Sequence, residues 1–337
     1  LKAIDEACEG RHFQEFRDIN ELPEDSGRRV LTTGGHYGYL KIAEGCDKHC
    51  TYCIIPSLRG RFRSVPQERL IAQAEHMAEQ GVKELILVAQ ETTMYGTDLY
   101  GKKTLHLLMK ELCKIKGIRW IRVLYCYPEE IYDELIQVMK EEKKICHYLD
   151  LPIQHASDRI LKRMGRRTTR AQLTAIIEKL RKEIPDIVLR TTLITGFPGE
   201  TEADHQEVME FVDEMEFDRL GAFTYSPEEG TPAETMEGQI PEEVKEERRD
   251  EIMELQQEIS LEKGNDRIGQ ELLVMIEGKV SGESAYIART YGDAPKVDGY
   301  IFVQTGELLM TGDFAKVRVT GALEYDLIGE LADEYTE

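Results

Sequence analysis

Three cysteines, Cys46, Cys50 and Cys53, lie in one short segment with the spacing C-x3-C-x2-C, and no fourth cysteine lies nearby. A structural zinc ion normally takes four protein ligands, and each of the four irons of an iron–sulfur cube takes one. Three thiolates would therefore leave one iron of a cube without a protein ligand. The segment predicts a cube whose open iron can bind a small molecule.

Two other interpretations of this segment are weaker. His49 could complete a Cys3His zinc site, but it adjoins Cys50 in the chain, and adjacent residues do not easily share one tetrahedron. A disulfide with one spare thiol is also disfavoured, because no signal peptide precedes the segment and the other cysteines are scattered. The sequence therefore predicts a protein of the reducing cytoplasm.

Composition bounds the class of protein. The chain has 337 residues, of which 41% are apolar, and no apolar stretch long enough for a membrane span. Its formal charge of −21 would repel a polyanion such as transfer RNA and favour a cationic partner, although net charge also serves solubility.

Alternating predicted strands and helices fill the first two thirds of the chain. Continuous apolar runs such as 85–88 and 121–124 are typical of buried parallel strands, and helical patterns separate them. The series predicts an α/β fold, a partial (β/α)6 barrel with its chemistry at the carboxyl ends of the strands. The expected strands are 39–43, 85–88, 121–124, 147–149, 187–194 and 220–224, and the expected helices are 66–80, 104–114, 129–141, 172–182 and 202–215.

The rest of the chain predicts further segments. Residues 1–37 show no compact hydrophobic pattern, and we interpret them as the remnant of a linker after a missing amino-terminal domain. The barrel is expected over 38–240, and a charged connector helix over 241–263. Short alternating strands at 271–276, 285–289, 299–303 and 314–319 predict a small all-β barrel over 264–334.

Polar residues follow the predicted strands, as expected where the carboxyl ends of the strands line one opening of the barrel. A cap or turn explains some of them equally well: Thr201 with Asp204 would make a helix capping box. An open iron suits the amino and carboxylate groups of S-adenosylmethionine (SAM). Candidates for contacting this cofactor are Tyr52 beside the adenine, Gly196 and Gly199 where backbone approaches closely, and Glu91, Gln154 and Arg190 at its charged ends.

Several motifs resemble the methylthiotransferase branch of the radical SAM enzymes. They are GCDKHCTYCIIPSLRGRFRS, RVLYCYPEEI, YLDLPIQHASDRILKRMGR, RTTLITGFPGET and FDRLGAFTYSPEEGTPA. Asp150 and the pair Gln154-His155 resemble the members that modify a ribosomal protein more than those that modify transfer RNA. Residues 264–334 resemble the TRAM domain that closes these proteins.

The resemblance implies cofactors and a reaction. Cys46, Cys50 and Cys53 would hold a reducing 4Fe–4S cluster, and SAM would supply both a radical and a methyl group. The implied target is the β-carbon of an aspartate in small-subunit ribosomal protein twelve, with flavodoxin or ferredoxin as electron donor.

A second 4Fe–4S cluster is implied on the missing amino-terminal domain. The four remaining cysteines do not have that domain's pattern; they are Cys8, Cys113, Cys126 and Cys146. We therefore expect the chain to cleave SAM without completing methylthiolation alone.

The charge of the small domain bears on the target. Residues 264–337 carry six basic and fourteen acidic side chains, a net charge of −8, which suits a basic protein better than RNA. Two alternatives stay open: a transfer-RNA methylthiotransferase, and a cluster-bearing module that binds the ribosomal protein without turnover.

Overall fold

The computed structural model describes residues 2–14, 18–22 and 31–332. Parts of the segment predicted as a linker remnant, residues 1, 15–17 and 23–30, lie outside the described residues, as do residues 333 and 334 of the predicted small domain. Helix α1 (Lys2–Cys8) lies within the first segment and buries none of its side chains.

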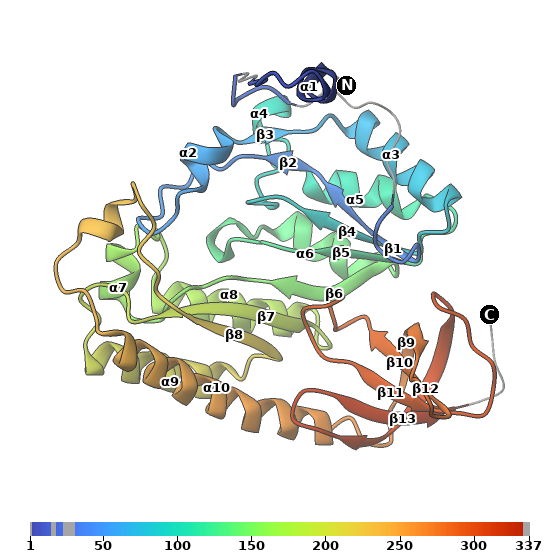
Figure 1. Cartoon of the computed structure of the whole chain (residues 1–337). Helices are drawn as coiled ribbons and strands as arrows, with labels where there is room; N and C mark the ends of the chain where they lie inside the picture. Colours follow the sequence, from blue (N-terminus) through green and yellow to red (C-terminus); the bar gives the residue numbers. More distant parts are fainter. Residues whose placement is uncertain (1, 15–17, 23–30, 333–337) are drawn as a thin grey trace.

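Six parallel strands form one sheet, which confirms the predicted α/β class and partial barrel (Figure 1). Their order is β1-β4-β5-β6-β7-β8, and β1 and β8 do not pair with each other in the described part of the chain. The barrel is therefore open on one side. The strands are β1 (Tyr37–Lys41), β4 (Glu84–Val88), β5 (Trp120–Val123), β6 (Ile145–Asp150), β7 (Val188–Thr195) and β8 (Arg219–Thr224).

Helices follow the strands and cover the outside of the sheet. The helix predicted over 129–141 begins only at Asp133, because Pro128 opens a 3-10 turn, η1 (Pro128–Glu130), and Ile131 is extended. The helices of this layer are α3 (Gln67–Glu79), α5 (Leu105–Cys113), α6 (Asp133–Glu141), α7 (Asp158–Arg163), α8 (Arg170–Glu183) and α9 (Glu202–Met215). Two short helices, α2 (Ile55–Arg59) and α4 (Thr97–Tyr100), bury none of their residues.

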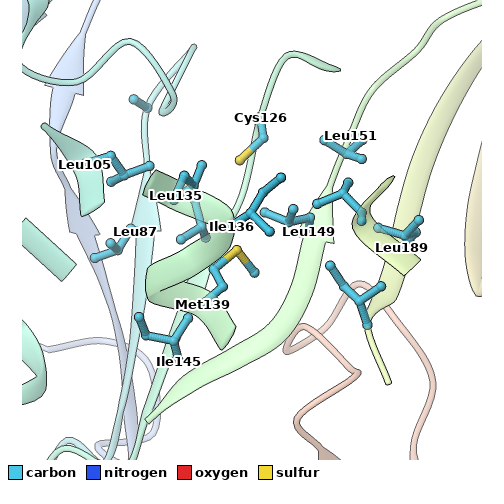
Figure 2. Close-up of a cluster of buried hydrophobic side chains, with 14 of the residues drawn as sticks. Leu87, Leu105, Cys126, Leu135, Ile136, Met139, Ile145, Leu149, Leu151 and Leu189 are labelled. Carbon is cyan, nitrogen blue, oxygen red and sulfur yellow. The ribbon is translucent and has the colours of Figure 1, made fainter. Parts of the chain in front are cut away.

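The main core lies between the sheet and these helices. Successive side chains of a strand point to opposite faces, so Leu85 and Leu87 of β4 face the helices together. Figure 2 shows part of this layer, where Leu135 and Met139 of α6 lie near Leu149 of β6. Each fully buried side chain of this kind stabilises the fold by about 1.5–3 kcal/mol.

Helix α10 (Glu242–Asn265) packs more closely than the predicted connector would. It contacts β7, β8 and α9, and buries Ile252, Gln256 and Ile259 along one side. Two charged side chains, Lys245 and Arg248, are also buried, because each has an acidic partner. The high charge of the segment concealed this packed face.

Five strands close into the small barrel that the sequence predicted, in the order β10-β11-β13-β12-β9. Strand β13, the last along the chain, was not predicted, because Gly329 and Glu330 interrupt its apolar alternation. The short strands β2 (Ala43–Glu44) and β3 (Arg63–Ser64) of the large domain were also missed. The barrel strands are β9 (Glu271–Lys279), β10 (Ala285–Thr290), β11 (Ile301–Gln304), β12 (Phe314–Ala322) and β13 (Leu327–Leu331).

The small barrel docks against the amino ends of the parallel strands. Tyr37, Trp120 and Val188 lie near the starts of their strands and share a buried cluster with Met275 and Phe314 of the barrel. Trp120 and Phe314 meet edge to face, with ring centroids 4.8 Å apart. One end of the sheet is thus covered, and the other carries the cysteine segment (Figure 1).

Within the described residues, no helix combines the length and the apolar composition that crossing a membrane needs.

Candidate cofactor site

The cysteine loop leaves the sheet through a glycine that no other residue could replace without a shift. Gly45 has a φ of +79°, and a Cβ there would lie 2.1 Å from the carbonyl oxygen of Arg61. The Gly45 amide donates to Gln90 Oε1 at 2.9 Å, and the Cys46 amide donates to the carbonyl of Gly60 at 3.2 Å. The tight turn at Gly45 therefore fixes the position of the Cys46 backbone.

The far side of the loop rests on the end of α7. The Thr51 amide donates to the carbonyl of Met164 at 2.9 Å, and Thr51 Oγ1 donates to the carbonyl of Arg163 at 2.9 Å. Gly165 packs so closely that a Cβ would lie 2.7 Å from the carbonyl oxygen of His49. The three cysteines are thus held by contacts from two distant segments.

The thiols of this loop are shielded from water. Cys46 and Cys50 are buried and Cys53 is half-buried, and all seven cysteines of the chain are free. Burial raises the pKa of Cys46 to about 11 and also raises the pKa of Cys53. These thiols become thiolates when a metal replaces their protons.

The described residues form no site for a single metal ion at the cysteine loop. Among the described residues, no three His, Cys, Asp or Glu side chains converge on a point that one metal ion could occupy. A cube takes one thiolate per iron, so its ligands stay apart. A cube held by Cys46, Cys50 and Cys53 therefore stays a prediction.

Tyr127 connects the loop to two cations. Its Oη lies 3.6 Å from Cys50 Sγ. Lys48 Nζ lies 5.1 Å and Arg166 Cζ 4.3 Å from the centroid of its ring. Burial, followed by the nearby Cys50, raises the pKa of Tyr127, so this phenol stays neutral.

Glu91 and Gln154, both candidates from the sequence, lie at the carboxyl ends of β4 and β6 with unpaired buried atoms. Glu91 Oε1 accepts from the Thr93 amide at 2.9 Å, while Glu91 Oε2 and Gln154 Oε1 have no partner. Burial raises the pKa of Glu91 to about 7. Gln154 also has a φ of +72°, which is rare for a residue with a side chain.

Tyr52, predicted to lie beside adenine, packs against a buried cluster next to the cysteine loop that includes Phe197 and Tyr225. Its ring meets Phe197 edge to face, with centroids 6.4 Å apart, and Phe197 meets Tyr225 in the same way at 5.4 Å. Burial, followed by the charge of the nearby Cys50, raises the pKa of Tyr52. The prediction of an adenine contact stays a prediction.

Arg190 lies away from the cysteine loop and contacts the small barrel. Its Nη1 is 2.8 Å from Asp150 Oδ1, and its Nε is 3.4 Å from Asp298 Oδ1. Both carboxylates are buried, so the guanidinium is already committed to two partners. The structure thus gives Arg190, and with it Asp150, a role in joining the domains, and the cofactor contact of Arg190 stays a prediction.

The two predicted ligand-approach glycines are needed for packing against the protein itself. A Cβ at Gly196 would lie 2.1 Å from Lys245 Cγ, and a Cβ at Gly199 would lie 3.1 Å from Arg163. Both have positive φ, and the Gly199 amide donates to the carbonyl of Gly238 at 2.7 Å. The close neighbours of both glycines are side chains of this protein, and their contact with a ligand stays a prediction.

Lys48, Tyr127 and Arg166 were not among the sequence candidates, although all three lie in the motifs. Tyr127 follows a predicted strand, which was the available signal. Arg166 lies on a loop after α7, far from the cysteines in sequence, so only folding brings it to Cys50.

Comparison with known proteins identifies the two domains and their cofactors. Residues 40–212 match the radical SAM superfamily, and residues 268–332 match the TRAM domain. The predicted cofactors, a 4Fe–4S cluster and SAM, are thereby confirmed. Among solved structures, coproporphyrinogen III oxidase (HemN) from Escherichia coli, a radical SAM enzyme, has a TM-score of 0.48 and 16% identity, covering 84% of this chain and 66% of that one.

Curated relatives extend the similarity over almost the whole chain. The ribosomal protein uS12 methylthiotransferase RimO of Lachnoclostridium phytofermentans is 61% identical over 328 residues, which cover 97% of this chain and 74% of that protein. RimO of Clostridium botulinum is 50% identical over 339 residues, covering 100% of this chain and 75% of that protein. This chain therefore belongs to the RimO family of radical SAM methylthiotransferases.

Proposed function

We propose that Cys46, Cys50 and Cys53 hold the 4Fe–4S cluster and that SAM binds at its open iron, inside the carboxyl end of the barrel. The observation that carries this proposal is the pair of unpaired buried atoms, Glu91 Oε2 and Gln154 Oε1, at that same end of the sheet. A buried polar atom without a partner costs about 1–3 kcal/mol. Atoms of this kind indicate that a polar ligand completes the site.

The bound cluster and SAM supply a one-electron cleavage of SAM to a radical that abstracts hydrogen from carbon. The residues of the chain provide the surroundings that such chemistry needs. Tyr52, Phe197 and Tyr225 form an apolar cluster that keeps water from the foot of the loop. Glu91, whose pKa is about 7, can hold a proton at Oε2 or accept a hydrogen bond there near neutral pH.

The test is anaerobic reconstitution with iron and sulfide, reduction with dithionite, and chromatography for 5′-deoxyadenosine. We expect the wild type to bind iron and form this product, and Cys50→Ala to do neither. Cys113→Ser is the matched control, because Cys113 is half-buried on α5 and belongs to no predicted site. Equal iron content in the wild type and Cys50→Ala would reject the assignment.

For the substrate, we propose uS12, the ribosomal protein that the relatives' names print, with methylthiolation at an aspartate β-carbon. The acidic charge of residues 264–337 supports a basic protein over transfer RNA. A ribosomal substrate places the reaction in the cytoplasm, where flavodoxin or ferredoxin would donate the electron.

Binding measurements at several salt concentrations test this choice. We expect uS12 to bind, with an affinity that falls as the salt concentration rises. The double variant Glu283→Lys with Glu324→Lys changes two residues exposed on the small barrel and should lower this affinity about tenfold or more. Glu75→Lys with Glu79→Lys, both exposed on α3, is the control for the same change of charge. Tighter binding of transfer RNA than of uS12 would favour the RNA-modifying alternative.

A further inference from the structure

Arg166 is buried at the cysteine loop without enough partners for its charge. The residue is 6% exposed, and its Nε and Nη1 have no hydrogen-bond partner. Its Nη2 donates to the carbonyl of Pro152 at 3.0 Å, and the nearest carboxylate oxygen, Glu129 Oε2, is 3.7 Å away. A buried guanidinium is costly unless paired, so two nitrogens without a hydrogen-bond partner call for an explanation.

The position of Arg166 directs its charge toward Cys50. The guanidinium stacks on the ring of Tyr127, with 4.3 Å from Cζ to the centroid, and the hydroxyl of that ring lies 3.6 Å from Cys50 Sγ. The charge also acts on Cys50 and Tyr52 directly. Although burial disfavours its charged form, neighbouring Tyr52 and Glu129 keep the pKa of Arg166 above its usual range, so the cation is permanent.

The backbone holds Arg166 in this place. Its amide donates to the carbonyl of Leu161 at 2.9 Å, and the preceding Gly165 lies against the carbonyl of His49. Gly165 has a φ of +74°, which turns the chain under the cysteine loop. The cation and the loop are therefore parts of one packed unit.

We propose that Arg166 is a positioning residue that sets the reduction potential of the cluster, by placing a buried positive charge near the Cys50 thiolate, across the ring of Tyr127. This inference rests on the proposed cluster at the three cysteines. One-electron reduction adds negative charge to a cluster, so a nearby buried cation stabilises the reduced form and raises the potential. No proton needs to move in this step.

The experiment compares four reconstituted proteins: wild type, Arg166→Gln, Arg166→Lys and Arg167→Gln. Arg167 is the neighbouring arginine and is exposed, so its variant controls for the loss of one charge. Iron content and the circular dichroism spectrum are measured first, and the cluster is then titrated with dithionite, without SAM, while its electron paramagnetic resonance signal is recorded.

We expect Arg166→Gln to keep its iron and to lower the equilibrium constant for reduction about tenfold, which is about 59 mV for a one-electron couple. Arg166→Lys keeps the charge and should lie near the wild type, and Arg167→Gln should match the wild type. Equal potentials in Arg166→Gln and Arg167→Gln would overturn the proposal. A difference that appears only after SAM is added would also overturn it, because Arg166 would then be a ligand of the SAM carboxylate.

If Arg166→Gln does not retain iron, Arg166→Lys decides. An Arg166→Lys protein with full iron content and the wild-type potential supports the role of the charge. A folded Arg166→Lys protein that loses its iron, or whose equilibrium constant for reduction falls tenfold, contradicts it. Failure of the wild type itself to bind iron would reject the proposed cluster site and is distinguishable from both results.

Discussion

Glu84 of β4 and Arg289 of β10 form an ion pair of 2.7 Å between Oε2 and Nη2, and both side chains are fully buried where the two domains meet. The other oxygen of Glu84, Oε1, lies 2.8 Å from Arg122 Nε, which is buried as well. Burial alone would raise the pKa of Glu84, but Arg289 and Arg122 hold that pKa below its usual range. One carboxylate thus neutralises a cation from each domain.

Replacing Glu84 with alanine should strongly destabilise the protein. The change leaves Arg122 and Arg289 buried without this counter-ion, and breaking a buried pair in this way costs about 3–5 kcal/mol. Chemical denaturation should show a lower midpoint and separate unfolding of the two domains. Glu271→Ala is the control, because its pair with Arg318 is half-exposed and should contribute less than about 1 kcal/mol. Equal losses in the two variants would contradict this account of the interface.

Gly45→Ala should reduce iron binding. The added Cβ meets the carbonyl oxygen of Arg61, and the positive φ itself costs about 1–2 kcal/mol for a residue with a side chain. Iron content after reconstitution is the measurement. Gly81→Ala shares the positive φ but has no atom within 4 Å of the new Cβ, so it separates the backbone cost from the collision. Full iron content in Gly45→Ala would show that the loop adapts.

Glu91 should make the metal-free protein less stable as the pH rises. Its pKa is 4.5 in an ordinary setting and about 7 in the folded chain, since burial penalises the carboxylate. Below about pH 4.5 the group is protonated in both states, and above about pH 7 it is ionised in both, with a penalty on the order of 3 kcal/mol.

Urea denaturation of wild type and Glu91→Gln, from about pH 4 to about pH 8, measures this effect. The wild type should lose stability relative to the variant between about pH 4.5 and pH 7. The exposed Glu75→Gln is the control. A difference between wild type and Glu91→Gln that is the same at every pH would refute the buried-carboxyl argument.

Thr201→Ala should cost about 1 kcal/mol by removing an N-cap. The sequence predicted this capping box, and the structure confirms it: Thr201 Oγ1 accepts from the Asp204 amide, and Asp204 accepts from the Thr201 amide at 2.8 Å. Thermal unfolding measures the loss. Thr235→Ala is the control, because Thr235 is exposed, ends the short 3-10 helix η2 (Pro232–Thr235) and caps no α-helix. It should change stability by less than Thr201→Ala does.

Local features of the sequence were predicted well because their causes are local. The capping box at Thr201, for example, depends on neighbours a few residues away. Continuous apolar runs likewise located the parallel strands, since both faces of a parallel sheet are covered.

Long-range features were missed because their partners are distant in sequence. The sequence did not predict that Arg190 pairs with Asp298 or that Gly196 packs on Lys245. Arg166 reaches Cys50 only after α7 folds against the cysteine loop. A polar residue after a strand therefore indicates an end of the sheet without identifying the partner of its side chain.

The small barrel covers the amino ends of the parallel strands, whereas the cysteine segment lies at their carboxyl ends. A macromolecule that is modified beside the cysteines must therefore approach the sheet from its carboxyl side. Any contact it makes with the acidic small barrel lies at the other end of the sheet, so binding and modification would use two separate surfaces of the protein.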